Sequence, residues 1–357
     1  MRYRIKETYT EDLNMFDEKY KFYLCAALVV SLFFLPLFLD SYVIYIFNLL
    51  FIYIIISIGL NLLTGNTGLV SLGHAAFVAV GAYSSAILTT KASLPFWIAF
   101  PLSGLITAAV GIVVAVPALR TKGFYLAIIT LGFSFIIEEF IIRWESLTNG
   151  ALGMKVPSAS IGNIVFDTEN KFYYLIFPIT VICIIAVKNL LRTGFGKALG
   201  AIRDNDIAAE SIGINLIKYK FMVFGVSAFL AGIAGSFMAH LTKMIGPSSF
   251  TLLDSITYLV IIVIGGLGSL MGSILGAIFI TFLPEVIRFL KDFIPGVEGI
   301  IQIYQSIFYG LIMMLFLLFE PNGFFGRWVK IKYYFETFPV GRKVKKKKVI
   351  VTSMKKM

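Results

Sequence analysis

The sequence has little charge. Only 14% of its 357 residues are Asp, Glu, Lys or Arg, whereas 58% are hydrophobic. A soluble domain carries about 25% charged residues, because polar side chains must cover its surface. Here the apolar excess falls in uncharged blocks of about 18–25 residues, which is the length of helix that crosses a bilayer. The low charge therefore excludes an ordinary soluble domain and predicts a membrane protein.

Cysteine and histidine are equally scarce, with two of each in the chain. Cys25 and Cys183 lie inside apolar blocks, where they read as small buried hydrophobes rather than as a disulfide framework. His74 and His240 are far apart, and no H-E-x-x-H pair occurs. An intramembrane enzyme is therefore disfavoured, and we expect no cofactor to be bound by this chain.

A nucleotide-binding motif is missing as well. No G-x-x-x-x-G-K-[ST] occurs, and the run Gly194-Phe195-Gly196-Lys197 lacks the spacing and the hydroxyl needed to cradle phosphates and hold Mg²⁺. No soluble segment is long enough for a nucleotide-binding domain. If this membrane protein moves a solute, the energy must therefore come from a separate ATPase, which would bind the ATP and Mg²⁺, or from a gradient.

What the chain does contain is a series of ten apolar blocks. They cover residues 22–39, 43–64, 68–88, 96–117, 124–142, 172–190, 219–241, 252–268, 270–290 and 300–319. Glycine-rich breaks precede the third block and separate the eighth from the ninth. Such breaks are tolerated in a bilayer only where the backbone is buried in protein or lines a cavity. We therefore predict an all-α, polytopic membrane helix bundle of about ten spans, some of them broken or re-entrant.

Lys and Arg residues orient this bundle. If all ten blocks cross and the N-terminus is cytoplasmic, 24 of the 31 Lys and Arg residues fall on the cytoplasmic side. Basic residues set topology, whereas acidic ones contribute little. The sequence therefore predicts that both termini and the loop over residues 192–218 are cytoplasmic. The predicted organisation is a cytoplasmic arm (1–21), a transmembrane domain (22–320) that contains the cytoplasmic loop, and a basic cytoplasmic tail (321–357).

The tail concentrates the positive charge. Arg342, Lys343 and the four lysines at 345–348 form one run. Anionic lipid at a cytoplasmic membrane face attracts each such charge by about 1 kcal/mol. We expect the tail to bind anionic lipid as an orientation anchor. Nucleic acid is not an expected partner, because no aromatic residues interleave with the run and no folded domain surrounds it.

The 192–218 loop has the composition of a structured element. Asp204, Asn205 and Asp206 offer N-cap acceptors, residues 207–212 can form under two helical turns, and Gly213 suits the end of that helix. A helix this short is marginal by itself and needs a surface to pack on. Two interpretations remain. The helix is an amphipathic connector on the membrane surface, or it is a coupling helix whose small alanines admit the backbone of a separate ATPase.

Several runs resemble the permeases of branched-chain amino acid ABC importers, the LivH/LivM family, with an order and spacing that favour the LivM branch. The most specific are Ser71-Leu72-Gly73-His74 and Ile207-Ala208-Ala209-Glu210. The other matching runs lie within residues 59–65, 68–77, 123–133, 148–153, 196–213, 229–235 and 265–276. One departure is the stretch 134–139, where the family's usual polar residue is absent, so substrate preference does not transfer at this position.

The resemblance implies a permease subunit that forms the translocation path for branched-chain amino acids in a bacterial-type plasma membrane. It implies as partners two ATPase subunits, a second related permease and an extracytoplasmic solute-binding protein. It also implies that the ATPase docks on residues 203–214. The residues implied in this coupling are Arg203, Asp204, Asp206, Ile207, Ala208, Ala209, Glu210 and Gly213. A urea or short-chain amide importer and a gradient-driven secondary carrier remain alternatives.

Few polar groups interrupt the spans, and such groups usually face protein or water and serve function. The candidates for the translocation path are Asn61, Ser71, His74 and Tyr83. For His74 a second interpretation stands beside this one, in which the ring bonds a neighbouring carbonyl and locks a broken helix. Small residues at helical spacing, such as Gly272 and Gly276, predict close packing between helices.

Overall fold

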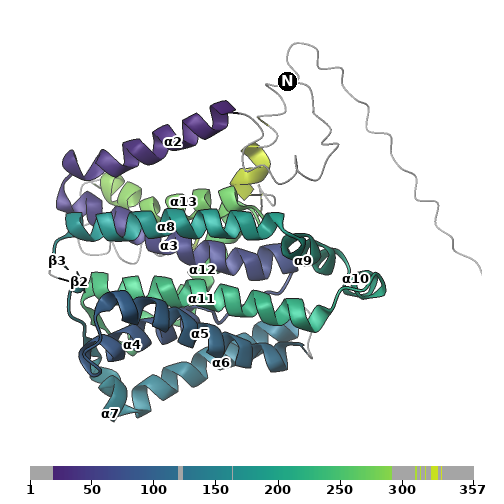
Figure 1. Ribbon diagram of the computed structural model, residues 1–357, viewed down its shortest axis with the longest axis horizontal. Helices are drawn as coiled ribbons and strands as arrows, with labels where there is room; N and C mark the ends of the chain where they lie inside the picture. The colour runs from purple at the N-terminus through teal and green to yellow at the C-terminus, as the bar shows by residue number, and fades with distance from the viewer. Residues whose placement is uncertain are drawn as a thin grey trace, which may run out of the picture.

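The computed structural model describes residues 19–119, 124–162, 164–291 and 323–328, together with residues 310, 311, 314, 318 and 331 (Figure 1). Most of these residues are helical, which confirms the predicted helical class. The predicted arm, the block 300–319 and the basic tail lie almost wholly outside the described residues.

Among the described residues, six helices are long and apolar enough to cross a membrane. They are α3 (Ser41–Thr67), α5 (Phe96–Leu119), α6 (Phe124–Arg143), α8 (Glu169–Arg192), α11 (Leu216–Thr242) and α12 (Leu252–Gly265), the last together with the turn before it. Three further helices are α2 (Lys19–Phe34), α4 (His74–Thr90) and α13 (Leu270–Lys291), whose apolar parts are shorter and cover Ala26–Leu37, His74–Thr90 and Leu270–Val286. Each predicted block up to residue 290 therefore coincides with an apolar helix, while the number of spans and the side of the termini stay predictions.

The long helices lie side by side, and their connections gather at two opposite ends (Figure 1). One end carries α9 (Gly194–Asp204) and α10 (Asp206–Ser211), between α8 and α11. We call it the α9–α10 end, and the distribution of basic residues predicts that it is cytoplasmic. The other end, which we call the hairpin end, carries α7 (Glu145–Thr148) and the strands.

Short strands at the hairpin end were not predicted from the sequence. β1 (Met154–Lys155) pairs antiparallel with β4 (Met244–Ile245), and β2 (Ala159–Ile161) pairs antiparallel with β3 (Ile164–Phe166). Single-turn helices η1 (Leu35–Leu37), η2 (Gly150–Leu152) and η3 (Pro247–Ser249) complete the connections. Strands of two or three residues are too short to show a periodic pattern, so the sequence carries no signal for them.

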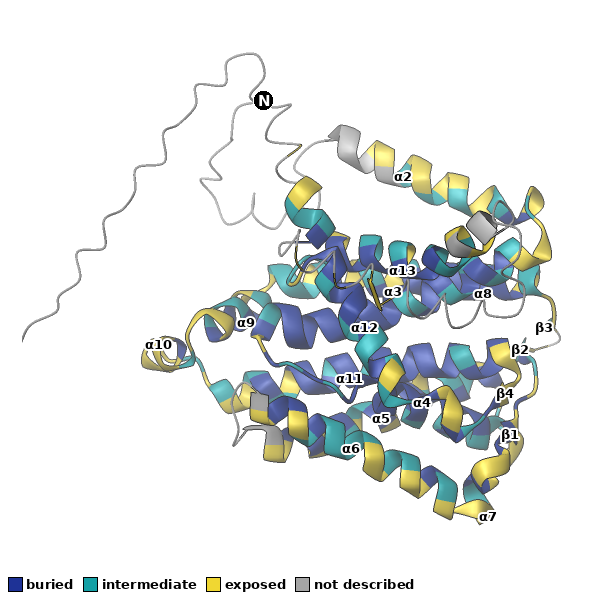
Figure 2. Cartoon of the chain, turned by 180° about the vertical axis from the view of Figure 1, so that it is seen from behind, coloured by how far each residue is buried: buried dark blue, intermediate teal, exposed yellow. Residues whose placement is uncertain are grey.

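The core is centred on α3 and α11, which are buried along most of their length (Figure 2). α11 packs on α3, α4 and α5, and it does so at close range. A Cβ atom placed on Gly81 of α4 would lie 2.3 Å from the Cα atom of Gly232 of α11. On α13, a Cβ atom placed on Gly276 would lie 2.0 Å from the carbonyl oxygen of Ile261 in α12. The predicted close packing at small residues is therefore confirmed at these two contacts.

Two breaks in the helices meet near the α9–α10 end. The first break, residues 68–73, separates α3 from α4, and the second, residues 266–269, separates α12 from α13. Gly68 has a φ of +75° and Gly268 a φ of +80°, a region that only glycine enters at little cost. A Cβ atom on Gly65 would lie 2.3 Å from the Gly268 nitrogen, so the last turn of α3, which leads into the first break, touches the second break.

Candidate functional site

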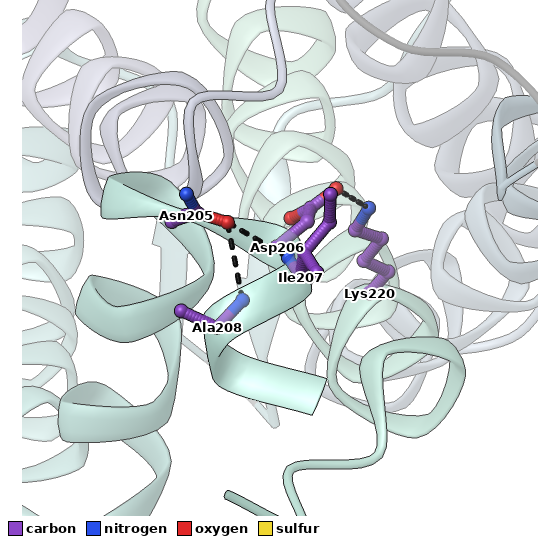
Figure 3. A network of polar contacts seen from close by, with 5 residues as sticks. All are labelled: Asn205, Asp206, Ile207, Ala208 and Lys220. Atoms are coloured by element: carbon purple, nitrogen blue, oxygen red, sulfur yellow. Dashed lines mark hydrogen bonds and ion pairs between the residues drawn. The ribbon is translucent and has the colours of Figure 1, made fainter. Parts of the chain in front are cut away.

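The helix α10 is capped as the sequence predicts. The side-chain oxygen of Asn205 accepts hydrogen bonds from the backbone N–H groups of Ile207 and Ala208, at 2.9 Å and 3.1 Å (Figure 3). Gly213 follows the helix with a φ of +90°, a left-handed conformation that ends it. The predicted short helix over residues 207–212 is thus confirmed to within one residue at each end.

An ion pair ties α10 to the rest of the chain. The Lys220 ammonium of α11 lies 3.0 Å from an oxygen of Asp206, and the two side chains are only 7% and 20% exposed (Figure 3). The sequence predicted Asp206 as a possible cap and as a coupling residue but not as an ion-pair partner, and it gave no role to Lys220. The one signal for this ion pair in the sequence was a lysine at the start of an apolar block. Two residues that pair across 14 positions leave no periodic pattern in the sequence.

The outer surface of α10 and its flanks is apolar. Ile207 and Ile212 are each 73% exposed, and Ile217 in the first turn of α11 is 60% exposed. Ala208 and Glu210 are exposed beside them. These side chains form what we call the isoleucine surface, defined by Ile207, Ile212 and Ile217. An exposed apolar patch of this kind marks an interaction site on a partner or a membrane.

Ala209 differs from our expectation. We predicted that Ala208 and Ala209 would both leave room for a partner, but Ala209 is only 2% exposed. Its side chain is buried against the rest of this chain and helps to hold α10 in place, because a helix of six residues exposes only part of its surface. The part that Ala209, Asp204 and the other residues of the loop play in coupling stays a prediction.

Arg203 occupies the last turn of α9 and reaches both helix breaks. A Cβ atom placed on Gly68 would lie 3.7 Å from Arg203 Cγ, and one placed on Gly268 would lie 2.5 Å from Arg203 Nη1. The side chain therefore lies against both breaks, with its stem on the first and its guanidinium on the second. Sequence reasoning placed Arg203 in the loop but gave no hint of these contacts.

Asn61, a candidate for the translocation path, is hydrogen-bonded to the backbone of the second break. Its Nδ2 donates a hydrogen bond to the carbonyl oxygen of Ser269 at 3.0 Å, and its Oδ1 accepts one from the Gly268 N–H at 2.8 Å. Both ends of the amide are thus engaged with the backbone between α12 and α13. Backbone groups released by a glycine break need such partners when they are buried.

The first break is held between two neighbouring helices. The Thr130 hydroxyl of α6 accepts a hydrogen bond from the Leu72 N–H at 3.0 Å. The Ser255 hydroxyl of α12 accepts one from the Ala75 N–H, also at 3.0 Å. Ser71 is buried within this segment and accepts a longer bond from the Gly73 N–H at 3.4 Å. The break is therefore an ordered turn inside the bundle.

His74 begins α4 just beyond this turn and is fully buried. The Ile56 backbone interacts with its ring, but neither ring nitrogen completes a hydrogen bond. The second interpretation of His74 requires a hydrogen bond from its ring to a carbonyl that locks the broken helix. The structure shows no well-formed bond of this kind. A buried polar group left without a hydrogen bond costs free energy, so such groups are uncommon away from functional sites.

Tyr83 lies apart from the other three path candidates. It is nine residues beyond His74 on α4, which is about 13 Å along a helix axis. Its hydroxyl is buried without a partner, and its ring contacts Phe250 with the centroids 6.4 Å apart. The structure therefore gathers Asn61, Ser71 and His74 around the two breaks and leaves Tyr83 nearer the hairpin end.

An apolar groove lies elsewhere in the described part of the chain. It is an open space of about 580 Å³ between α5 and α6, lined by apolar residues that include Val113, Phe133 and Ile136. None of the four path candidates lines it. No group of three or more His, Cys, Asp or Glu side chains that could hold a metal ion occurs within the ranges the structure covers.

The chain is similar to known transport proteins. Residues 42–317 match the family model described as branched-chain amino acid transport system / permease component. The LivM permease protein of the high-affinity branched-chain amino acid transport system of Salmonella typhimurium is 32% identical over 85% of this chain and 75% of the relative, and so is LivM of Escherichia coli. LivH of Escherichia coli is 22% identical over 77% of this chain and 91% of the relative. No solved structure gives a significant match.

Proposed function

Since the chain belongs to the family of branched-chain amino acid transport permeases, on its LivM branch, we propose that it forms part of the translocation path of an ABC importer for branched-chain amino acids. As a permease it is a transport subunit and not an enzyme. Its apolar helices make it an integral membrane protein, which we place in a bacterial plasma membrane.

The partners in this proposal are a pair of ATPase subunits, a second related permease and an extracytoplasmic solute-binding protein. ATP and Mg²⁺ would bind to the ATPases, since this sequence contains no phosphate-binding loop. The similarity to both LivM and LivH relatives supports a second, related permease in the same assembly. The basic tail is proposed to contact anionic lipid.

The single observation that carries ATPase docking is the isoleucine surface on a preformed α10. The helix is capped by Asn205 and fixed by the Asp206–Lys220 pair before any partner arrives. A partner therefore loses little free energy to ordering when it binds. The surface also lies at the end that the basic residues assign to the cytoplasm, where an ATPase would work.

The experiment is to replace Ile207 by Glu and to measure co-purification of the ATPase subunits with the tagged permease. A charge in the buried centre of an interface costs several kcal/mol when it is left unpaired, so we expect the ATPase to be lost. Because Ile207 is 73% exposed, the fold should be kept. The matched control is Leu152→Glu, which changes an 85% exposed side chain at the hairpin end and should leave the complex intact.

Unchanged co-purification in Ile207→Glu would contradict docking on this surface. It would favour the alternative of an amphipathic connector on the membrane. Substrate choice is tested separately, by the uptake of leucine against that of urea in vesicles that hold the full complex. A preference for urea would replace the amino acid proposal by the amide alternative.

A further inference from the structure

Arg203 connects parts of the molecule that the sequence keeps far apart. Its Cγ faces Gly68 in the break between α3 and α4, and its Nη1 faces Gly268 in the break between α12 and α13. A Cβ atom added to Gly268 would lie only 2.5 Å from that nitrogen, so the guanidinium lies against this backbone. Arg203 is therefore the point at which the α9–α10 end meets both breaks.

The end of α3, which leads into the first break, is also joined to the second break. Asn61 of α3 bonds the backbone of both Gly268 and Ser269, at 2.8 Å and 3.0 Å. The Gly65 backbone approaches Gly268 so closely that a Cβ atom on Gly65 would lie 2.3 Å from the Gly268 nitrogen. Packed interiors resist continuous deformation, so a shift of the second break must be accompanied by a shift of the end of α3, from which the first break continues.

No flexible linker separates Arg203 from α10. Asn205 ends α9, where its N–H donates to the Ala201 carbonyl at 3.1 Å, and the same residue caps α10 through its side chain. Arg203 is thus two residues from the start of the cap that fixes α10. A partner that displaces α10 would displace Arg203 with it.

The positive charge of Arg203 favours its contact with the two breaks. α3 ends at Thr67 and α12 ends at Gly265, so Arg203 lies beside the C-terminal ends of two helices. The partial negative charge of a helix C-terminus attracts a cation, and the guanidinium carries its charge on a flat fork of five N–H groups. A lysine at this position would keep the charge and the stem but would lose the fork.

We propose that Arg203 is a positioning residue that transmits a displacement of α10 to both helix breaks, and through the first break to the buried segment around Ser71 and His74. This inference rests on the proposed function. It differs from the role that the family resemblance implies for Arg203, because it assigns this exposed side chain to its contacts with Gly68 and Gly268 of this chain and not to a contact with the ATPase.

The test uses the complete importer in proteoliposomes, with tritiated leucine as the probe. Uptake and ATP hydrolysis are measured together for Arg203→Ala, Arg203→Lys and the control Lys218→Ala. Coupling between sites is typically worth about 5–150-fold, so we expect Arg203→Ala to move at least about five-fold less leucine per ATP while the complex still co-purifies. Arg203→Lys should be intermediate, because its stem still reaches Gly68. Lys218→Ala removes one positive charge from the same end and should match the wild type.

A merely structural role for Arg203 would lower uptake and ATP hydrolysis together and leave their ratio unchanged, and that result would overturn the inference. Loss of the ATPase from Arg203→Ala would also overturn it, because it would place the side chain in the docking surface. If Arg203→Ala does not fold, the ratio measured for Arg203→Lys decides, and a wild-type ratio there refutes the role of the guanidinium. A wild-type complex without ATP-driven leucine uptake would instead defeat the proposed function, and the inference with it.

Discussion

Replacing Asp206 by Ala should release α10 from α11, and the cost follows from the exposure of the two partners. The substitution leaves the Lys220 ammonium only 7% exposed and without the carboxylate that now lies 3.0 Å away. Removing one partner of a buried ion pair typically costs about 3–5 kcal/mol, because a buried charge is left uncompensated. We expect a value near the lower limit, about 3 kcal/mol, because Asp206 is 20% exposed and water already reaches the pair.

The opposite substitution should cost less. Lys220→Met keeps the apolar stem in place and leaves Asp206, which is the more exposed partner. A carboxylate that water can reach loses only about 1 kcal/mol of stabilisation when this ammonium is removed. The double variant should then cost less than the sum of the two, with a coupling energy of about 2 kcal/mol. Glu210→Ala removes an exposed acid from the same helix and should cost about 0.5 kcal/mol or less.

The assay is limited trypsin digestion of the permease in detergent, followed at Arg203 and Lys218, which flank α10. Cleavage tracks the population of the locally open form when opening and closing are fast. A cost of about 3 kcal/mol corresponds to an acceleration of up to about a hundredfold. Equal rates for Asp206→Ala and Glu210→Ala, or strictly additive effects of the two pair substitutions, would refute the reasoning.

Three further predictions concern local geometry. Asn205→Ala should destabilise α10 by about 1 kcal/mol, whereas Asn205→Asp should be nearly neutral, and trypsin digestion measures both. Gly213→Ala places a side chain at a φ of +90° in open space, so the cost of about 1–2 kcal/mol is backbone strain alone, and local hydrogen exchange should show it as weaker protection around α10. Gly81→Ala should lower the thermal unfolding midpoint because its Cβ would lie 2.3 Å from Gly232, whereas Gly132→Ala, with no atom within 4 Å, should not; equal midpoints would contradict the close α4–α11 packing.

The sequence predicts what depends on local chemistry. The apolar blocks locate the helices because crossing a bilayer requires length and hydrophobicity, both of which are local. α10 could be placed because its cap, its length and Gly213 are contiguous. The family motifs of the loop lie on this helix, and those around Ser71 lie on the first break.

What the sequence could not predict depends on contacts between distant segments. The Asp206–Lys220 pair and the contacts of Arg203 with Gly68 and Gly268 follow from how the helices pack. The inward orientation of Ala209 has the same origin, because a helix of six residues is too short for its apolar face to be read from periodicity. Asn61 is the clearest example. As a polar residue in a span it indicated the translocation path, but the sequence could not show that its amide bonds the backbone of the second break.

The most direct test of the central claim, that this chain supplies a path and another protein supplies the power, is leucine uptake by proteoliposomes with and without the ATPases. We predict ATP-dependent accumulation of leucine by the full complex, and none by the permeases alone under a proton or sodium gradient. Accumulation driven by a gradient in the absence of the ATPases would contradict the account and make the chain a secondary carrier.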